Sequence, residues 1–162
     1  MKTRHKLFLV LTTGVLALDQ SSKAVVSSTL KLHESRPIIH GLLNLTLVHN
    51  TGAAFGLMSG QVSIGRTLFF LTLSLLAMCF VLWMLFRLPE SHKTEMVSLS
   101  LIFAGALGNG IDRIRLGKVI DFIDLYYRDH HWPAFNLADS AISVGVALLL
   151  FRLFFPAEKT TV

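Results

Sequence analysis

The sequence predicts an all-α membrane protein, in which four transmembrane helices carry a small extracytoplasmic β element. Composition is the first observation: 52% of the 162 residues are hydrophobic and only 15% are charged, unlike soluble domains. Four apolar stretches approach the roughly 20 residues that a helix needs to cross a bilayer. Between the first two stretches, apolar and polar residues alternate as in a β-strand.

A single integral-membrane domain is expected over residues 1–162. The sequence contains no long linker, low-complexity tract or repeat of fixed period. Its one cysteine, Cys79, lies within an apolar run, which excludes a disulfide framework or a cysteine-based metal cluster within one chain.

The predicted spans cover about Leu7–Val26, Thr67–Phe86, Met96–Ile111 and Leu137–Phe155. The second span carries no charged residue and is the clearest of the four. The third is short and rich in glycine, so we expect Gly105 and Gly108 to let it pack closely against neighbouring helices.

The first span also resembles a secretory signal, but we expect it to be retained. Asp19 and Lys23 stand four residues apart on one helical face, an ion pair for which a cleavable peptide has no use. A charge at this depth is costly unless it is paired, so this face should point into the protein. A structural salt bridge and a functional role remain alternatives for the pair.

Residues 43–47 alternate leucine with asparagine and threonine, which predicts a strand, and the turn residues HNTG follow it. Asn50 and Gly52 belong to this turn. Asn50 either closes the turn, or it joins the Gly52 backbone in hydrogen-bonding an extended peptide along the strand edge.

Two acids, Asp121 and Asp139, lie beside apolar segments in the loop before the fourth span and at its start. Asn136 and Asp139 have the spacing of a helix N-cap and a first-turn acid, which is a purely structural explanation for both. Capping does not explain Asp121, which is embedded among valine, isoleucine and phenylalanine. Such surroundings raise the pKa of a carboxyl group and cost stability unless the group has a partner or a function.

If the two carboxyl groups meet at a membrane boundary, they share one proton, because both cannot ionise cheaply at close range. One would then act as general base toward a water molecule and the other as general acid toward the amide. The helix amino end favours an ionised Asp139, but a coupled pair titrates as a unit, so the sequence leaves the position of the proton open.

Five motifs, in their order and spacing, resemble those of the lipoprotein signal peptidases, also called signal peptidase II: DQSSK, NTGAAFG, GALGNGIDR, VIDF and FNLADS. The resemblance runs from about Asp19 to Ser140. It implies an aspartic endopeptidase of the bacterial cytoplasmic membrane, with extracytoplasmic strands that form a cradle for the substrate. Such an enzyme cleaves the signal peptide of a prolipoprotein just before a cysteine that carries diacylglycerol, without a metal or other cofactor.

The resemblance also implies the residues of the site, with Asp121 and Asp139 as the catalytic dyad. Six more would line or brace the site: Asp19, Lys23, Asn50, Asn109, Arg113 and Asn136. The peptide-binding interpretation of the turn adds Gly52 to these candidates. The amides of Asn109 and Asn136 suit an oxyanion or the fixing of the dyad, and helix packing and capping are the alternatives. Arg113 suits a lipid or peptide carbonyl oxygen, or a lipid phosphate.

The expected partners are lipid-modified prolipoproteins and membrane lipid, and the chain is expected to work as a monomer. Despite a net charge of +5, no basic helix with interleaved aromatic residues suggests nucleic acid. An even number of spans places both termini on one side, and the basic start MKTRHK makes that side cytoplasmic. The site would then face outward, although Arg113, Arg115 and Lys118 on the outer side run against the charge rule.

Three other functions fit parts of the sequence. Ser27 lies four residues from Lys23, as a serine–lysine peptidase would need. The run Asp129 to His131 suggests a metallopeptidase, but the motif HExxH is absent. A small transporter or membrane scaffold could use Asp19 and Lys23 as an intramembrane relay. A relay requires charges near the middle of the membrane, whereas the two acids of the dyad cluster at one face.

Overall fold

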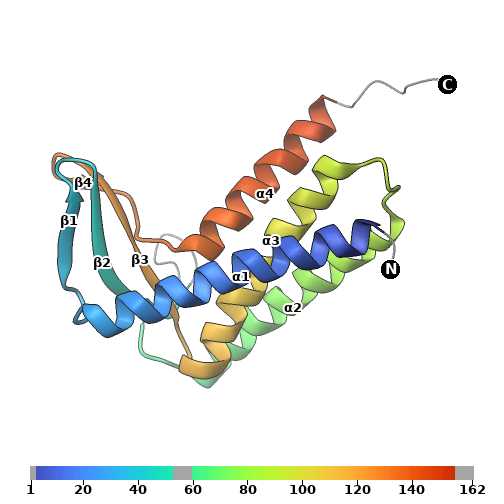
Figure 1. Cartoon of the computed structure of the whole chain (residues 1–162). Helices are drawn as coiled ribbons and strands as arrows, with labels where there is room; N and C mark the ends of the chain where they lie inside the picture. The colour runs from blue at the N-terminus through green and yellow to red at the C-terminus, as the bar shows by residue number, and fades with distance from the viewer. Residues whose placement is uncertain (1–2, 53–59, 156–162) are drawn as a thin grey trace.

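The computed structural model describes residues 3–52 and 60–155, and these form four helices and four strands (Figure 1). The helices are α1 (Thr3–Thr29), α2 (Ile64–Arg87), α3 (Lys93–Leu116) and α4 (Leu137–Phe154). The strands are β1 (Ser35–Ile39), β2 (Leu43–Asn50), β3 (Val119–Tyr127) and β4 (His130–His131). Each predicted span coincides with a helix. Residues 53–56 of the NTGAAFG motif lie outside the described residues.

Three of the helices, α2, α3 and α4, are long and apolar enough to cross a membrane. With 27 residues at about 1.5 Å each, α1 is also long enough. It lacks the composition of a span because Asp19, Gln20 and Lys23 lie within it. The sequence therefore predicted the positions of all four helices, and three of them have the composition of a transmembrane segment.

The central helix of the bundle is α3, which contacts α1, α2 and α4. Within its 18-residue apolar window, 56% of the residues are buried, against 17% in α2 and in α4. Close packing depends on glycine, as predicted. A Cβ atom at Gly105 would collide with the carbonyl oxygen of Ala138 and lie 2.7 Å from Cγ1 of Ile142. A Cβ atom at Gly108 would lie 2.6 Å from Oδ2 of Asp19.

The β element is larger than predicted: a four-stranded antiparallel sheet in the order β1-β2-β3-β4. The sequence predicted a strand only where β2 lies and placed Asp121 on a loop. That placement was wrong, because Asp121 lies in β3, opposite Val48 of β2. Most of the first half of β3 is buried, so its sequence lacks the alternation of a half-exposed strand.

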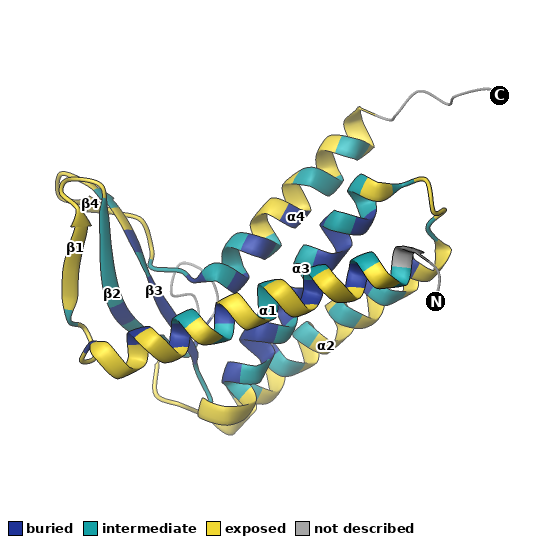
Figure 2. Ribbon diagram, viewed as in Figure 1, coloured by how far each residue is buried: buried dark blue, intermediate teal, exposed yellow. Residues whose placement is uncertain are grey.

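One face of the sheet packs against the carboxyl end of α1. Leu47, Ile120 and Phe122 of the sheet form a buried cluster with Val26 of α1 and with Leu30, which directly follows this helix. Buried segments of β2, β3 and α1 come together there (Figure 2). The sheet therefore lies at one end of the helical bundle. The amino end of α1 and the carboxyl end of α4 lie at the opposite end (Figure 1).

Adding one methyl group to α3 should test the packing of α3 on α4. Gly105→Ala should lower the free energy of unfolding by about 1–3 kcal/mol, since the new Cβ has no room. Gly110→Ala in the same helix is the matched control, because its Cβ meets no described atom within 4 Å. It should leave stability equal or higher, since alanine favours helix. Equal unfolding midpoints for Gly105→Ala and wild type in detergent would contradict the packing.

Candidate active site

The side chain of Asn136 begins α4 and fixes the position of Asp139. Asn136 is the N-cap, and its Oδ1 accepts a hydrogen bond from the backbone N–H of Asp139 at 2.9 Å. In return, the backbone N–H of Asn136 donates to Oδ2 of Asp139 at 3.3 Å. This reciprocal pair is a capping box. The predicted N-cap and first-turn acid are therefore confirmed.

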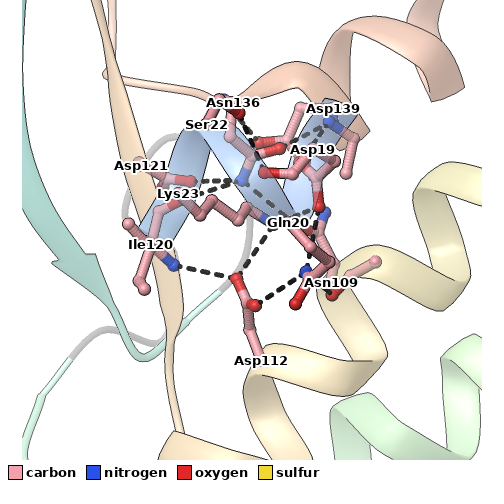
Figure 3. Close-up of polar contacts among 12 residues, drawn as sticks. Asp19, Gln20, Ser22, Lys23, Asn109, Asp112, Ile120, Asp121, Asn136 and Asp139 are labelled. Atoms are coloured by element: carbon pink, nitrogen blue, oxygen red, sulfur yellow. Dashed lines mark hydrogen bonds and ion pairs between the residues drawn. The ribbon is translucent and has the colours of Figure 1, made fainter. Parts of the chain in front are cut away.

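The same side chain also binds the second acid. Nδ2 of Asn136 donates to Oδ1 of Asp121 at 2.7 Å, and it lies 3.2 Å from both Oδ1 of Asn109 and the carbonyl oxygen of Ile120. Asn136 has no exposed surface. One buried amide thus brings the start of α4 and the strand β3 together, and the two acids lie around it (Figure 3).

Asp121 is buried in β3 and has a second amide partner. Its Oδ2 accepts a hydrogen bond from Nδ2 of Asn50 at 3.0 Å, and Oδ1 of Asn50 accepts from the N–H of Gly52 at 2.9 Å. Burial raises the pKa of Asp121 from 3.8 to about 7, and the neighbouring charge of Asp139 adds to this rise. The hydrogen bonds from Asn50 and Asn136 oppose it. This rise has the direction predicted for an acid among apolar neighbours.

Asn109 of α3 connects Asp139 to a buried cation. Its Nδ2 donates to Oδ1 of Asp139 at 2.7 Å, and its Oδ1 accepts from Nζ of Lys23 at 3.1 Å. The amide orientation follows from these partners, because an ammonium group can only donate and a carboxylate can only accept. Asn109 therefore links Asp139 to Lys23.

Lys23 lies between two buried carboxyl groups. Its Nζ is 2.9 Å from Oδ2 of Asp19 and 2.9 Å from Oδ2 of Asp112, and these three side chains are at most 3% exposed. Nε2 of Gln20 lies 3.1 Å from a carboxylate oxygen of each acid. The salt bridge expected between Asp19 and Lys23 is present. Sequence reasoning missed Asp112 and Gln20, although Asp112 follows Asn109 by three residues and so shares its helical face.

Both carboxyl groups of this network also accept backbone hydrogen bonds next to the two acids of the site. Oδ1 of Asp19 accepts from the N–H of Ala138 at 2.9 Å, and Oδ2 of Asp112 accepts from the N–H of Ile120 at 3.2 Å. Ala138 directly precedes Asp139, and Ile120 directly precedes Asp121. The ion network therefore anchors the backbone on which each acid of the site is carried.

Asp121 and Asp139 line a cavity of about 510 Å³. Arg113 lines it too; its NH2 group donates to the carbonyl oxygen of Gly52 at 3.0 Å, and its guanidinium lies 4.9 Å from the centre of the Phe70 ring. The cavity thus offers two carboxyl groups and a cation to a bound molecule.

The structure brings the nine predicted site residues together. Asn50, Asn109 and Asn136 contact the two acids directly. Gly52 contacts Asn50 and Arg113, whereas Lys23 reaches Asp139 through Asn109, and Asp19 lies behind Lys23.

Two alternative sites find no support in the described part of the chain. Ser27 is exposed, whereas Nζ of Lys23 is directed to other partners. Nδ1 of His131 lies 2.7 Å from Oδ1 of Asp124 in the sheet. Within residues 3–52 and 60–155, no three histidine, cysteine or acidic side chains cluster as a metal site.

Residues 11–155 match the family model described as signal peptidase II. The chain belongs to this family. It is 47% identical to a lipoprotein signal peptidase of Desulforapulum autotrophicum over 156 residues, which covers 96% of each chain. It is 48% identical to one of Geobacter metallireducens over 149 residues, or 92% of this chain and 91% of the relative. The resemblance carried by the five motifs is therefore confirmed.

Two solved structures, both described as bacterial membrane enzymes, have the same fold. The first superposes with a TM-score of 0.84 at 32% identity and covers 96% of this chain and 93% of its own. The second has a TM-score of 0.80 at 33% identity, with coverage of 93% and 94%. The chain is thus a multi-pass bacterial membrane enzyme.

Removing the carboxyl group of Asp19 should cost stability rather than chemistry. Asp19→Ala deprives Lys23 and the N–H of Ala138 of a buried partner, so we expect a loss of about 3–5 kcal/mol. Detergent melting, together with activity per folded molecule, measures both effects. Glu34→Ala is the control: it breaks a pair with Arg36 and a hydrogen bond from the N–H of Lys31, both at the surface, and should lower the melting temperature far less than Asp19→Ala does. An unchanged melting temperature for Asp19→Ala would count against its bracing role.

Proposed function

We propose that Asp121 and Asp139 are the catalytic pair of this enzyme. As a member of the signal peptidase II family, the chain is an aspartic endopeptidase that cleaves the signal peptides of prolipoproteins. The observation that carries the proposal is that one fully buried side chain, Asn136, hydrogen-bonds Asp121 through its Nδ2 and caps the helix turn that holds Asp139.

The two acids have different surroundings, which suits different roles. With a pKa of about 7, Asp121 carries a proton in a large fraction of molecules near neutral pH, as a general acid requires. Asp139 lies in the first turn of α4, where the helix dipole and the hydrogen bonds from Asn136 and Asn109 suit a carboxylate. Asp139 would therefore take a proton from the attacking water, while Asp121 protonates the amide nitrogen that leaves.

Arg113 is suited to hold the carbonyl oxygen of the substrate. Its guanidinium lines the cavity and has five N–H donors, of which one on NH2 binds the carbonyl oxygen of Gly52. Because this cation is already in place when the substrate binds, the protein need not reorganise as negative charge develops on the carbonyl oxygen. We assign Arg113 to substrate binding and charge stabilisation.

We also propose that all four helices span the membrane, with the site at the outer face and both termini of the chain in the cytoplasm. The charges of α1 support this, because Asp19 and Lys23 are buried while the residues it exposes include leucine and valine at positions 9, 10, 18 and 25. Strand β3, which carries Asp121, and the start of α4, which carries Asp139, lie away from the amino end of α1 (Figure 1). The site contains residues from α1, α3, α4, β2 and β3, which supports a single domain over residues 1–162.

A site at this boundary suits a substrate that cannot leave the bilayer. We propose that cleavage occurs just before a cysteine that carries diacylglycerol. Each buried methylene of such a lipid contributes about 0.8 kcal/mol to membrane binding, so the scissile bond stays near the surface. The two acids then act on the scissile bond at a depth where water is available.

Neutralising either acid should abolish the reaction. Asp121→Asn and Asp139→Asn should each lower cleavage of a diacylglyceryl precursor more than about a hundredfold, because neither amide can transfer the required proton. Cleavage is followed with purified protein in detergent, and melting confirms that each variant is folded. Ser27→Ala and a metal chelator are the controls and should leave activity unchanged. Full activity in either Asn variant would overturn the assignment.

A further inference from the structure

The cavity does not end at the two acids but continues along α4. Beyond Asp139 its wall includes Ser140, Ile142, Ser143 and Val144. Ser143 follows Asp139 by four residues, so it lies on the same face of the helix and about 6 Å further along the axis. Because α4 runs away from the sheet (Figure 1), Ser143 lies farther from the sheet than Asp139 does.

The hydroxyl group of Ser143 differs from its neighbours on the helices. Ser140 donates to the carbonyl oxygen of Asn136 at 2.9 Å, and Ser100 donates to that of Met96 at 2.7 Å. Such bonds within the helix satisfy a hydroxyl group in apolar surroundings. Ser143 is exposed, lines the cavity and makes no hydrogen bond to any described residue. Its hydroxyl therefore offers a donor to a molecule in the cavity.

We propose that Ser143 donates a hydrogen bond to an ester carbonyl of the diacylglyceryl group on the substrate cysteine. This inference rests on the proposed function, since it requires the scissile bond to lie at Asp121 and Asp139. Eight covalent bonds separate the scissile carbonyl carbon from the nearer ester carbonyl carbon, a reach of about 10 Å when extended. An ester carbonyl can therefore reach the helical turn below Asp139, where Ser143 lies.

The rest of the cavity wall fits the same ligand. Ile142 and Val144 flank the hydroxyl group with apolar surface, as the first methylenes of acyl chains require. The ester linkage is the polar part of the lipid that enters this depth, so it supplies the acceptor that the hydroxyl lacks. Ser143 would thus distinguish an ester-linked lipid from one without carbonyl groups, a specificity set by a single hydrogen bond.

The test pairs Ser143→Ala with a matched change in the substrate. Two synthetic precursor peptides are identical except that the cysteine carries a diacylglyceryl diester in one and the corresponding diether, without carbonyl groups, in the other. For the diester, Ser143→Ala should raise KM about two- to tenfold with kcat nearly unchanged, as loss of one neutral hydrogen bond predicts. For the diether, wild type and Ser143→Ala should have the same KM. Ser143→Thr keeps the hydroxyl and should retain the lower KM for the diester.

Thr72→Ala is the control variant, because Thr72 is exposed on α2 outside the cavity. It should change KM for neither substrate. If Ser143→Ala raised KM equally for the diester and the diether, or left KM for the diester unchanged, the role of Ser143 would be overturned. Cleavage of the diester by wild type would still uphold the proposed function. Failure of folded wild type to cleave the diester, or cleavage by Asp121→Asn, would instead overturn the proposed function itself.

Discussion

The site depends on one buried amide, the side chain of Asn136. Its oxygen caps α4 and its nitrogen binds Asp121, so a helix and a strand are brought together by two ends of one planar group. Aspartate at this position would lack the donor, and alanine would lack both donor and acceptor. An unsatisfied buried polar group costs about 1–3 kcal/mol. The loss of one hydrogen-bond partner of Asn136 would therefore also weaken the positions of its other partners. The geometry of the two acids follows from this constraint.

A second layer of the structure holds the backbone on which the acids stand. Asp19 and Asp112 share Lys23, and each also accepts the N–H of the residue directly before one acid of the site. Asn109 then joins Lys23 to Asp139. A buried ion pair is in general weak evidence for stability, but here the ion pairs fix the position of the backbone beside the two acids. The charges of Asp19, Lys23 and Asp112 are thus accounted for without a relay across the membrane.

The sequence predicted the features that depend on local spacing and missed those that depend on distant contacts. The helices, the N-cap at Asn136 and the pair of Asp19 with Lys23 follow from composition and from residues three or four apart. Strand β3 pairs with β2 some 70 positions earlier, and burial removes its alternation. Asp112 was missed because spacing alone does not reveal which helical face meets Lys23. That the remaining site residues share one site was predicted only from the family motifs, because their contacts join separate helices and strands.

The central claim is that Asp121 is held in a buried frame beside a second carboxyl group, so that the pair retains a proton near neutral pH. The most direct measurement is a pH titration of the Asp121 carboxyl carbon by ¹³C NMR, on labelled protein in micelles. The account predicts a midpoint of about 7, which falls in Asp139→Asn because the neighbouring negative charge is removed. A midpoint near the ordinary value of about 4, unaffected by Asp139→Asn, would contradict it.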